Sequence, residues 1–325
     1  MTAPSSIAEE LRQSIGLARD HAFGDDVARL EVHGNRVVGQ HLLPGLHVAV
    51  DERETGIRAV LRLEAGVHLA KPVHICFGVL PDRGRQDIEM DVTIEEEASV
   101  EILAHCTFPN AVEVEHTMQG VVRVGAGACY AYRERHVHGH SGGLRVVPHA
   151  KVYVGENARF STDFELLRGR CGDLDIDYVA EVAAGGVADM LSRVSARADD
   201  SIRIREAAVL CGDAARGVLT SHIALRDRSR AVVENELTAL APGARGHVDC
   251  KEIVLDEAQA RAVPVVDVRH PKAHVTHEAA IGSVDSKQLQ TLMARGLSED
   301  AAADLIIQGL LENGRRTQQP KEDTP

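Results

Sequence analysis

The chain has 325 residues, of which 44% are hydrophobic and 26% charged, so we expect a globular protein of one large domain or two ordinary ones rather than a disordered chain. Its formal net charge of −13 argues against nucleic acid and anionic membranes as main partners, because both bind basic surfaces. No run approaches about 18 apolar residues, and residues 1–14 lack the basic and apolar regions of a signal peptide, so we expect a cytoplasmic protein that does not span a membrane.

The first predicted element is a helix over residues 5–22, where Ile7, Leu11 and Ile15 lie near helical spacing. From about residue 28 to about residue 270 the hydrophobic period is two, and short β-branched runs are separated by glycine, aspartate and asparagine. This pattern predicts a mainly β body, and a sandwich, a barrel and a β-helix all fit it. Small residues and few aromatics favour the stacked rungs of a β-helix, but the periodicity alone does not decide.

Two short helices are predicted after the β body. Asp285 can cap the first, with Gly296 just past its end, and Ser298 can cap the second. Their apolar stripes comprise Leu289, Leu292 and Met293 in the first helix, and Ala302, Leu305, Ile306 and Leu310 in the second. Such stripes either pack on the β body, which is the commoner outcome, or offer a groove to a partner.

The cysteines show no CxxC pair, which argues against a zinc ribbon, a ferredoxin or a disulfide framework. They are Cys76, Cys106, Cys129, Cys171, Cys211 and Cys250. In a reducing compartment we expect most of them to be small buried hydrophobic residues.

A histidine-rich stretch, HVHGH, contains His136, His138 and His140. On a strand these side chains would face one way and could bind one metal, as in a zinc-dependent hydrolase. Gly139 and the glycines that follow favour an exposed loop instead, and the sequence fixes no carboxylate nearby to orient the imidazoles.

The stretch GHVDCKEIV is the better candidate for chemistry. On a strand His247 and Asp249 share one face, and Cys250 takes the other with Val248 and Glu252. A cysteine among charged residues is a candidate metal ligand or reactive thiol, since such neighbours are costly to bury. An edge strand with a half-buried cysteine explains the stretch equally well.

A second polar stretch, residues 270–282, contains His270, His274, His277 and Glu278. It is either a solvated loop or a metal or acid–base site. The chain has no P-loop motif of its own.

The stretch from residue 277 to residue 311 resembles the C-terminal signature of the SufB/SufD family, the scaffold components of iron–sulfur cluster assembly. That signature has a His-Glu or His-Gly pair, a run of small residues, a capped helix ending in Arg-Gly-Leu, and an acidic helix that reaches a glycine. The chain supplies His277-Glu278, residues 279–282, Asp285, residues 295–297 and Gly309. The resemblance is strongest over residues 245–311, and the chain is most similar to compact homologues that serve in place of both SufB and SufD.

The resemblance implies a right-handed parallel β-helix flanked by helices, a homodimer formed through the β-helix, and terminal helices that dock a SufC-type ABC ATPase. The domains expected are an N-terminal helical segment (1–27), a β-helix core (28–282), an ATPase-docking segment (283–313) and a disordered tail (314–325). The residues expected to contact the ATPase are Leu289, Leu292, Met293, Arg295, Leu297, Leu305 and Ile306. The absence of a P-loop agrees with an ATPase supplied by a partner.

By position, Cys250 corresponds to the SufB cysteine at the cluster site, Glu278 to its glutamate ligand and His277 to the adjacent histidine. His247 and Asp249, which flank Cys250, complete the expected set of iron ligands.

The chain departs from the family in places. Thr276 stands where SufB commonly has an acidic residue, and the sulfur-relay cysteine of full-length SufB has no secure match, although Cys171 or Cys211 could be analogues.

The expected ligand set suits a cluster that must be released. Storage and electron-transfer clusters prefer four thiolates, whereas harder carboxylate or imidazole ligands weaken a site. A symmetric dimer would supply Cys250 and Glu278 twice, for a transient cluster of the 4Fe–4S type destined for apo acceptor proteins. We therefore expect an assembly scaffold rather than an enzyme; the alternative is a SufD-like structural partner without its own cluster.

Overall fold

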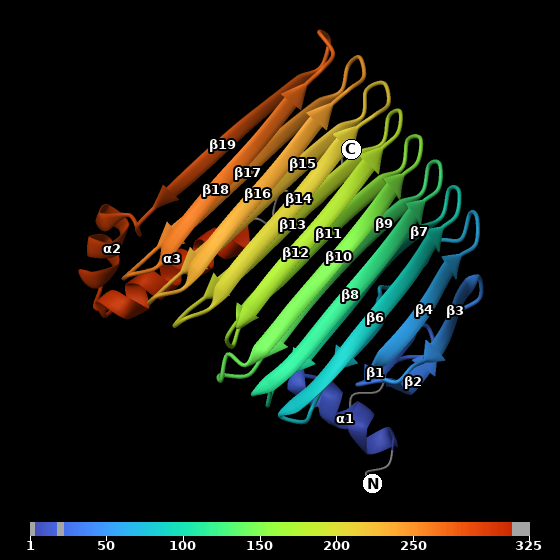
Figure 1. The fold of residues 1–325 in the computed structure, drawn as a ribbon, viewed down its shortest axis with the longest axis horizontal. Coiled ribbons are helices and arrows are strands. Elements are labelled where there is room, and N and C mark those ends of the chain that lie inside the picture. The colour runs from blue at the N-terminus through green and yellow to red at the C-terminus, as the bar shows by residue number, and fades with distance from the viewer. Residues whose placement is uncertain (1–3, 18–22, 314–325) are drawn as a thin grey trace.

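The computed structural model describes residues 4–17 and 23–313, and its body is a parallel β-helix of about eight turns (Figure 1). Within those residues the strands form a 10-stranded sheet A and a 9-stranded sheet B. Sheet A comprises, in spatial order, β19 (His274–Gly282), β17 (Arg245–Val254), β15 (Arg216–Leu225), β13 (Val187–Ala196), β11 (Arg159–Arg168), β9 (Cys129–His138), β7 (Ser99–Phe108), β5 (Val73–Gly78), β1 (Arg29–His33) and β2 (Arg36–His41). Sheet B comprises β18 (Gln259–Val268), β16 (Arg230–Ala239), β14 (Ser201–Leu210), β12 (Asp173–Val182), β10 (Leu144–Val154), β8 (Glu113–Val124), β6 (Arg83–Ile94), β4 (Gly56–Leu63) and β3 (Leu46–Glu52).

From β4 onward, successive strands alternate between the two sheets, and each pairs in parallel with the strand two positions along. In β12, Leu174, Ile176 and Tyr178 are buried between the sheets, whereas the residues between them are half-buried on the outer face. The period-two pattern therefore builds a mainly aliphatic interior. The prediction of a β-helix is confirmed, because parallel pairing between successive coils requires the chain to cross from one sheet to the other.

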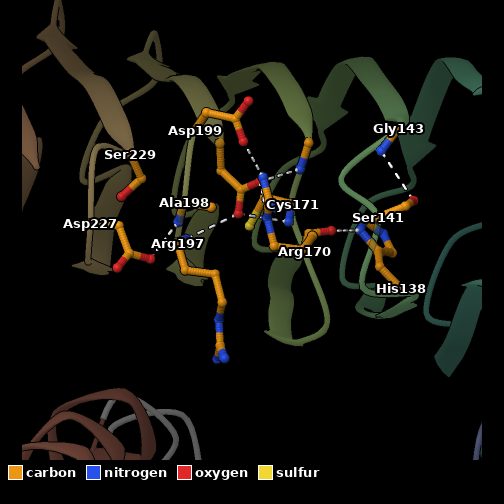
Figure 2. Close-up of polar contacts among 12 residues, drawn as sticks. His138, Ser141, Gly143, Arg170, Cys171, Arg197, Ala198, Asp199, Asp227 and Ser229 are labelled. Atoms are coloured by element: carbon orange, nitrogen blue, oxygen red, sulfur yellow. Dashed lines mark hydrogen bonds and ion pairs between the residues drawn. The ribbon is translucent and has the colours of Figure 1, made fainter. Parts of the chain in front are cut away.

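Carboxylate side chains help to hold the turns between coils (Figure 2). The buried carboxylate of Asp200 accepts hydrogen bonds from the N–H groups of Cys171 and Gly172 at 3.1 and 2.9 Å. One coil further, Asp227 accepts from the N–H of Ala198 at 2.7 Å, where the backbone has a φ of 53°. Aspartates that separate the strands in the sequence thus satisfy backbone donors of the neighbouring coil.

The two ends of the solenoid differ (Figure 1). At the N-terminal end β1–β2 and β3–β4 pair antiparallel, and α1 (Pro4–Ser14) contacts β1 and β2 and buries Leu11. The helix predicted over residues 5–22 ends earlier than expected, at Ser14, and residues 18–22 lie outside the described residues. At the C-terminal end β18 and β19 are the last strands of their sheets, so among the described strands each keeps one edge without a partner.

Two helices follow β19, and both predicted caps are present. The helix α2 (Ser286–Met293) begins where the Asp285 carboxylate accepts the N–H of Gln288 at 2.7 Å. The helix α3 (Glu299–Asn313) begins where Ser298 Oγ accepts the N–H of Ala301 at 3.3 Å. The tail predicted over residues 314–325 lies outside the described residues.

The helix α3 packs on the outer face of sheet A. Its buried residues include Ala303, Ile307 and Leu311, the last two in contact with Ala224 of β15. Leu305, which the sequence placed in the same stripe as Ala302, is 47% exposed and points away from this packed face. In the described part of the chain no helix is long and apolar enough to span a bilayer.

Candidate functional site

Cys250 lies on β17 with its side chain inside the solenoid and is 0% exposed. Asn235 of β16 donates from Nδ2 to Cys250 Sγ at 3.4 Å and to Ser221 Oγ at 3.1 Å. Burial raises the pKa of the thiol, and the nearby Glu252 carboxylate adds to this, whereas hydrogen bonds from Ser221 and Asn235 act in the opposite direction. In this conformation Cys250 is therefore a protonated, inaccessible thiol.

The residues that flank Cys250 face the other way. Asp249 accepts a hydrogen bond from Lys251 Nζ at 2.7 Å, and its carboxylate lies 4.0 Å from His222 Nε2. His247 Nδ1 lies 2.8 Å from Thr276 Oγ1 on β19. The alternation expected for this strand is confirmed, and it separates His247 and Asp249 from Cys250 by the thickness of the sheet.

His277 and Glu278 lie on β19, the exposed last strand of sheet A. The register pairs His277 with Val248, whose side chain is buried inside the solenoid, and Glu278 with Asp249 on the outer face. Residues in register share a face, so the structure brings His277 to the face of Cys250 and leaves Glu278 on the opposite one. The stretch 270–282 is thus mostly a strand rather than a loop: His270 lies in a turn and His274 begins β19.

The two C-terminal helices leave an apolar groove between them. A groove of about 760 Å³ is lined by residues of α2 and α3 together with Ile253 of β17. The predicted partner-contact residues Leu292, Leu305 and Ile306 line it. Met293 is 41% exposed, and α2 has no buried residue in the described chain. The apolar side chains of these two helices that do not pack on the β body are therefore accessible, beside β17, the strand that carries Cys250.

Comparison with known protein families shows to which family this chain belongs. The family model described as "SUF system FeS cluster assembly, SufBD core domain" matches residues 85–310, which include Cys250, His277 and Glu278. The chain belongs to the SufBD family.

Curated relatives of this SufBD family member span nearly its whole length. An iron–sulfur cluster assembly SufBD family protein of Methanocaldococcus jannaschii is 35% identical over 87% of this chain and 90% of its own. One from Pyrococcus horikoshii is 34% identical over 89% of this chain and 88% of its own. Membership implies a role in iron–sulfur cluster assembly, in a family of assembly scaffolds rather than classical enzymes.

The prediction that HVHGH forms an exposed loop is wrong for two of its histidines. His136 and His138 lie inside the solenoid at the end of β9 and are 2% and 6% exposed, whereas His140 is exposed in the following turn. The structure therefore does not bring the three imidazoles together. It does place a carboxylate beside one of them: Glu134 Oε1 lies 2.7 Å from His136 Nε2, a contact that the sequence did not indicate.

Polar groups surround Cys250 inside the solenoid: Glu252, which the sequence places on the same face, and Ser221 and Asn235, which local alternation did not indicate. Glu252 is buried, and so is Glu206 of β14, which is in register with Asn235 one coil away; burial raises the pKa of each carboxyl to about 7. Within the described residues, neither Glu252 oxygen nor Asn235 Oδ1 has a hydrogen-bond partner. In the sequence, the signal for this polar interior is a polar residue at an inward position of a period-two run, because burying such a residue without partners costs free energy.

Proposed function

We propose that this chain is the scaffold on which an iron–sulfur cluster is built and from which it passes to apo acceptor proteins in the cytoplasm. The observation that carries the proposal is the position of Cys250, which lies one strand from the open C-terminal end of the solenoid, on the face that His277 shares. The cluster is cargo, held long enough to be completed and then released.

The donor set fits a labile cluster. One thiolate and one imidazole per chain bind iron more weakly than four thiolates would. Glu278, on the opposite face of the exposed strand, joins these ligands when that strand moves or from a second copy of the chain. Two copies supply enough donors for a cluster of the 4Fe–4S type. His247, bonded to Thr276, and Asp249, bonded to Lys251, are the outer and weaker candidates.

The same geometry supports a homodimer through the C-terminal end of the β-helix. Strands with an unpaired edge readily pair with another chain. This end also exposes apolar side chains, with Val268 44% and Ile281 50% accessible. Pairing β19 or β18 of two copies would bring the two Cys250 residues towards one two-fold axis.

An ATPase partner of the SufC type explains how a buried thiol becomes available. The groove between α2 and α3 adjoins Ile253, three residues from Cys250 on the same strand. A partner that binds this groove and changes shape on ATP binding would favour a conformation in which β17 and β19 separate and Cys250 is exposed. Leu292, Leu305 and Ile306, which line the groove, are the first candidates for contact with the ATPase; Leu289, Met293, Arg295 and Leu297, outside its lining, are the further candidates.

Replacement of Cys250 tests the cluster site. The protein, with and without a SufC-type ATPase and ATP, is reconstituted anaerobically with ferrous iron and sulfide, and cluster absorption is measured. We expect Cys250→Ser to lose most of that absorption, because the chain loses its thiolate ligand. His277→Ala is expected to lose more than His247→Ala, since only His277 shares the face of Cys250. Cys129→Ser and Cys211→Ser, at exposed cysteines, are the matched controls. Full cluster absorption in Cys250→Ser would show that the site is elsewhere.

Charge introduced into the groove tests the docking surface. Leu292→Asp combined with Ile306→Asp is expected to weaken ATPase binding at least about tenfold, because two carboxylates must be desolvated in an apolar contact. Binding is measured by titration calorimetry. Val60→Asp places the same charge on an exposed valine of β4, at the other end of the solenoid, and should bind normally. Unchanged binding by the double variant would contradict the docking assignment.

A scaffold that binds the ATPase but never carries a cluster would instead be a SufD-like structural partner.

A further inference from the structure

A second set of potential metal ligands lies inside the solenoid, several coils away from Cys250. Cys106 of β7 and His136 of β9 are paired in register on neighbouring parallel strands, and Glu134 precedes His136 by two residues on the same face. One ligand atom from each lies within 4.8 Å of the others. The three residues are 1%, 1% and 2% exposed, in the order Cys106, Glu134, His136. The coil geometry thus brings a thiol, a carboxylate and an imidazole to one buried point.

Further hydrogen bonds orient two of these groups as metal ligands are usually oriented. His138 donates its Nδ1–H to the Arg170 carbonyl at 2.9 Å (Figure 2), so its Nε2 is left to accept the Nδ1–H of His136 at 3.0 Å. The Tyr178 hydroxyl donates to Glu134 Oε2 at 3.1 Å. Histidine ligands of metals commonly donate their second ring N–H, and ligating carboxylates commonly accept such a bond.

This arrangement leaves two lone pairs facing each other. With its Nδ1 hydrogen given to His138, a neutral His136 presents a lone pair at Nε2 to Glu134 Oε1, 2.7 Å away. Only a shared cation, a proton or a metal ion, stabilises such a contact. A proton would link these two groups and leave the Cys106 thiol to donate a weak hydrogen bond to the same carboxylate oxygen, 3.7 Å from Sγ, whereas a metal ion would bind all three ligand atoms directly.

The charges balance for a divalent ion. A dication held by one thiolate and one carboxylate forms a site of zero net charge, which an apolar interior accepts far better than an isolated ion. A mixed set of sulfur, nitrogen and oxygen donors suits ions of borderline softness such as Zn²⁺ and Fe²⁺, and disfavours Mg²⁺ and Ca²⁺.

We propose that Cys106, Glu134 and His136 bind one divalent transition-metal ion of this class, separately from the cluster ligands at Cys250. His116 is a candidate for a fourth ligand. It is 1% exposed, its ring centroid lies 6.3 Å from that of His136, and its Nδ1 has no hydrogen-bond partner among the described residues.

Metal content and cobalt spectroscopy test the site. The protein is produced in cells supplied with Zn²⁺, Fe²⁺ or Co²⁺, purified anaerobically and dialysed against chelator, and its metal is measured by mass spectrometry. We expect about one ion per chain that survives dialysis and is released on unfolding, because the site is buried. The ion retained when Zn²⁺ and Fe²⁺ compete identifies the preferred metal. The Co²⁺ form is expected to show thiolate-to-cobalt charge-transfer absorption.

Single substitutions locate the ion. Cys106→Ser should abolish the charge-transfer band, and the isosteric Glu134→Gln should lower retained metal at least about tenfold. Tyr178→Phe, which only removes the hydroxyl bonded to Glu134, should weaken retention about tenfold. Cys171→Ser, at a buried cysteine elsewhere, and Cys250→Ser, at the cluster site, should keep both metal and spectrum.

Each alternative result is decisive. If the wild type retains less than about a tenth of an equivalent of every metal, or if Cys171→Ser loses as much as Cys106→Ser, the proposal is wrong. Circular dichroism checks the fold of each variant, and if Cys106→Ser does not fold, Glu134→Gln and Tyr178→Phe decide. Loss of metal in Cys250→Ser alone would assign the ion to the cluster site, so the two sites are judged independently.

Discussion

Replacement of Arg193 by alanine is expected to lower the free energy of unfolding by about 3–5 kcal/mol. Arg193 is 1% exposed, and its Nη2 donates to both oxygens of Asp163 at 2.6 and 2.7 Å and to Glu165 at 2.8 Å. Alanine would leave these carboxylates beneath α3 without their guanidinium. Arg193 Nη1 also donates to the Leu311 carbonyl at 3.4 Å, so α3 would lose one of its attachments to sheet A.

Urea denaturation followed by circular dichroism measures this loss. The matched control is Arg145→Ala, which removes an exposed guanidinium that bonds Asp173 at 2.6 Å. Exposed ion pairs contribute at most about 1 kcal/mol, so this variant should stay close to the wild type. Hydrogen exchange should also quicken in residues 299–313 of Arg193→Ala. Equal stability losses in the two variants would contradict a structural role for the buried pair.

Because of Glu206, the free energy of unfolding is expected to fall as the pH rises from about 4.5 to about 7. Burial raises its pKa from 4.5 to about 7, and the negative charge of Asp189 adds to this, although Ser192 donates a hydrogen bond to it at 2.7 Å. Between these values the folded chain keeps a proton that the unfolded chain has lost, so folding is increasingly disfavoured as the pH rises. Across this pH range the ionisation of Glu206 lowers the free energy of unfolding by about 3 kcal/mol, and above pH 7 its contribution is constant.

Glu206→Gln should therefore recover about 3 kcal/mol at pH 8 while leaving stability at pH 4.5 nearly unchanged. Denaturation by urea at pH 4.5, 6 and 8 gives the comparison. Glu252, with a pKa raised to about 7 as well, remains in the variant, so part of the pH dependence should persist. Glu89→Gln, at an exposed carboxylate of β6, should leave the profile as in the wild type. A profile for Glu206→Gln that parallels the wild type would mean that Glu206 does not titrate in this window.

Local patterns were enough to predict the helical caps and the alternation around Cys250. Asp285 and Ser298 act on N–H groups three residues away, and the two faces of β17 follow from a period of two. His136 and His138 are the exception, because Gly139 indicates a loop in the sequence whereas both histidines lie buried on β9. Both histidines pack against Phe108, and His136 also lies against Phe164 and Cys106, all of which are far away in the sequence.

A repeat in the sequence would have identified the solenoid directly. Ala98, Ala128, Ala158, Ala215 and Ala244 end turns between coils and are all 0–1% exposed. The first three are 30 residues apart, and the last two 29, which is the length of one coil. Each follows a residue with positive φ, such as Asn157 at 56°, where the chain turns the corner between two coils.

The sequence by itself determined that the chain is a mainly β protein with capped C-terminal helices and the SufBD signature, because alternation, caps and motifs depend on neighbours in the chain. The tertiary structure alone decided which side chains meet. Register brings His277 to the face of Cys250, turns Glu278 away from it, and joins Cys106 to Glu134 and His136. These groups meet because residues one coil apart stack about 5 Å from each other, a distance fixed by hydrogen bonding between strands.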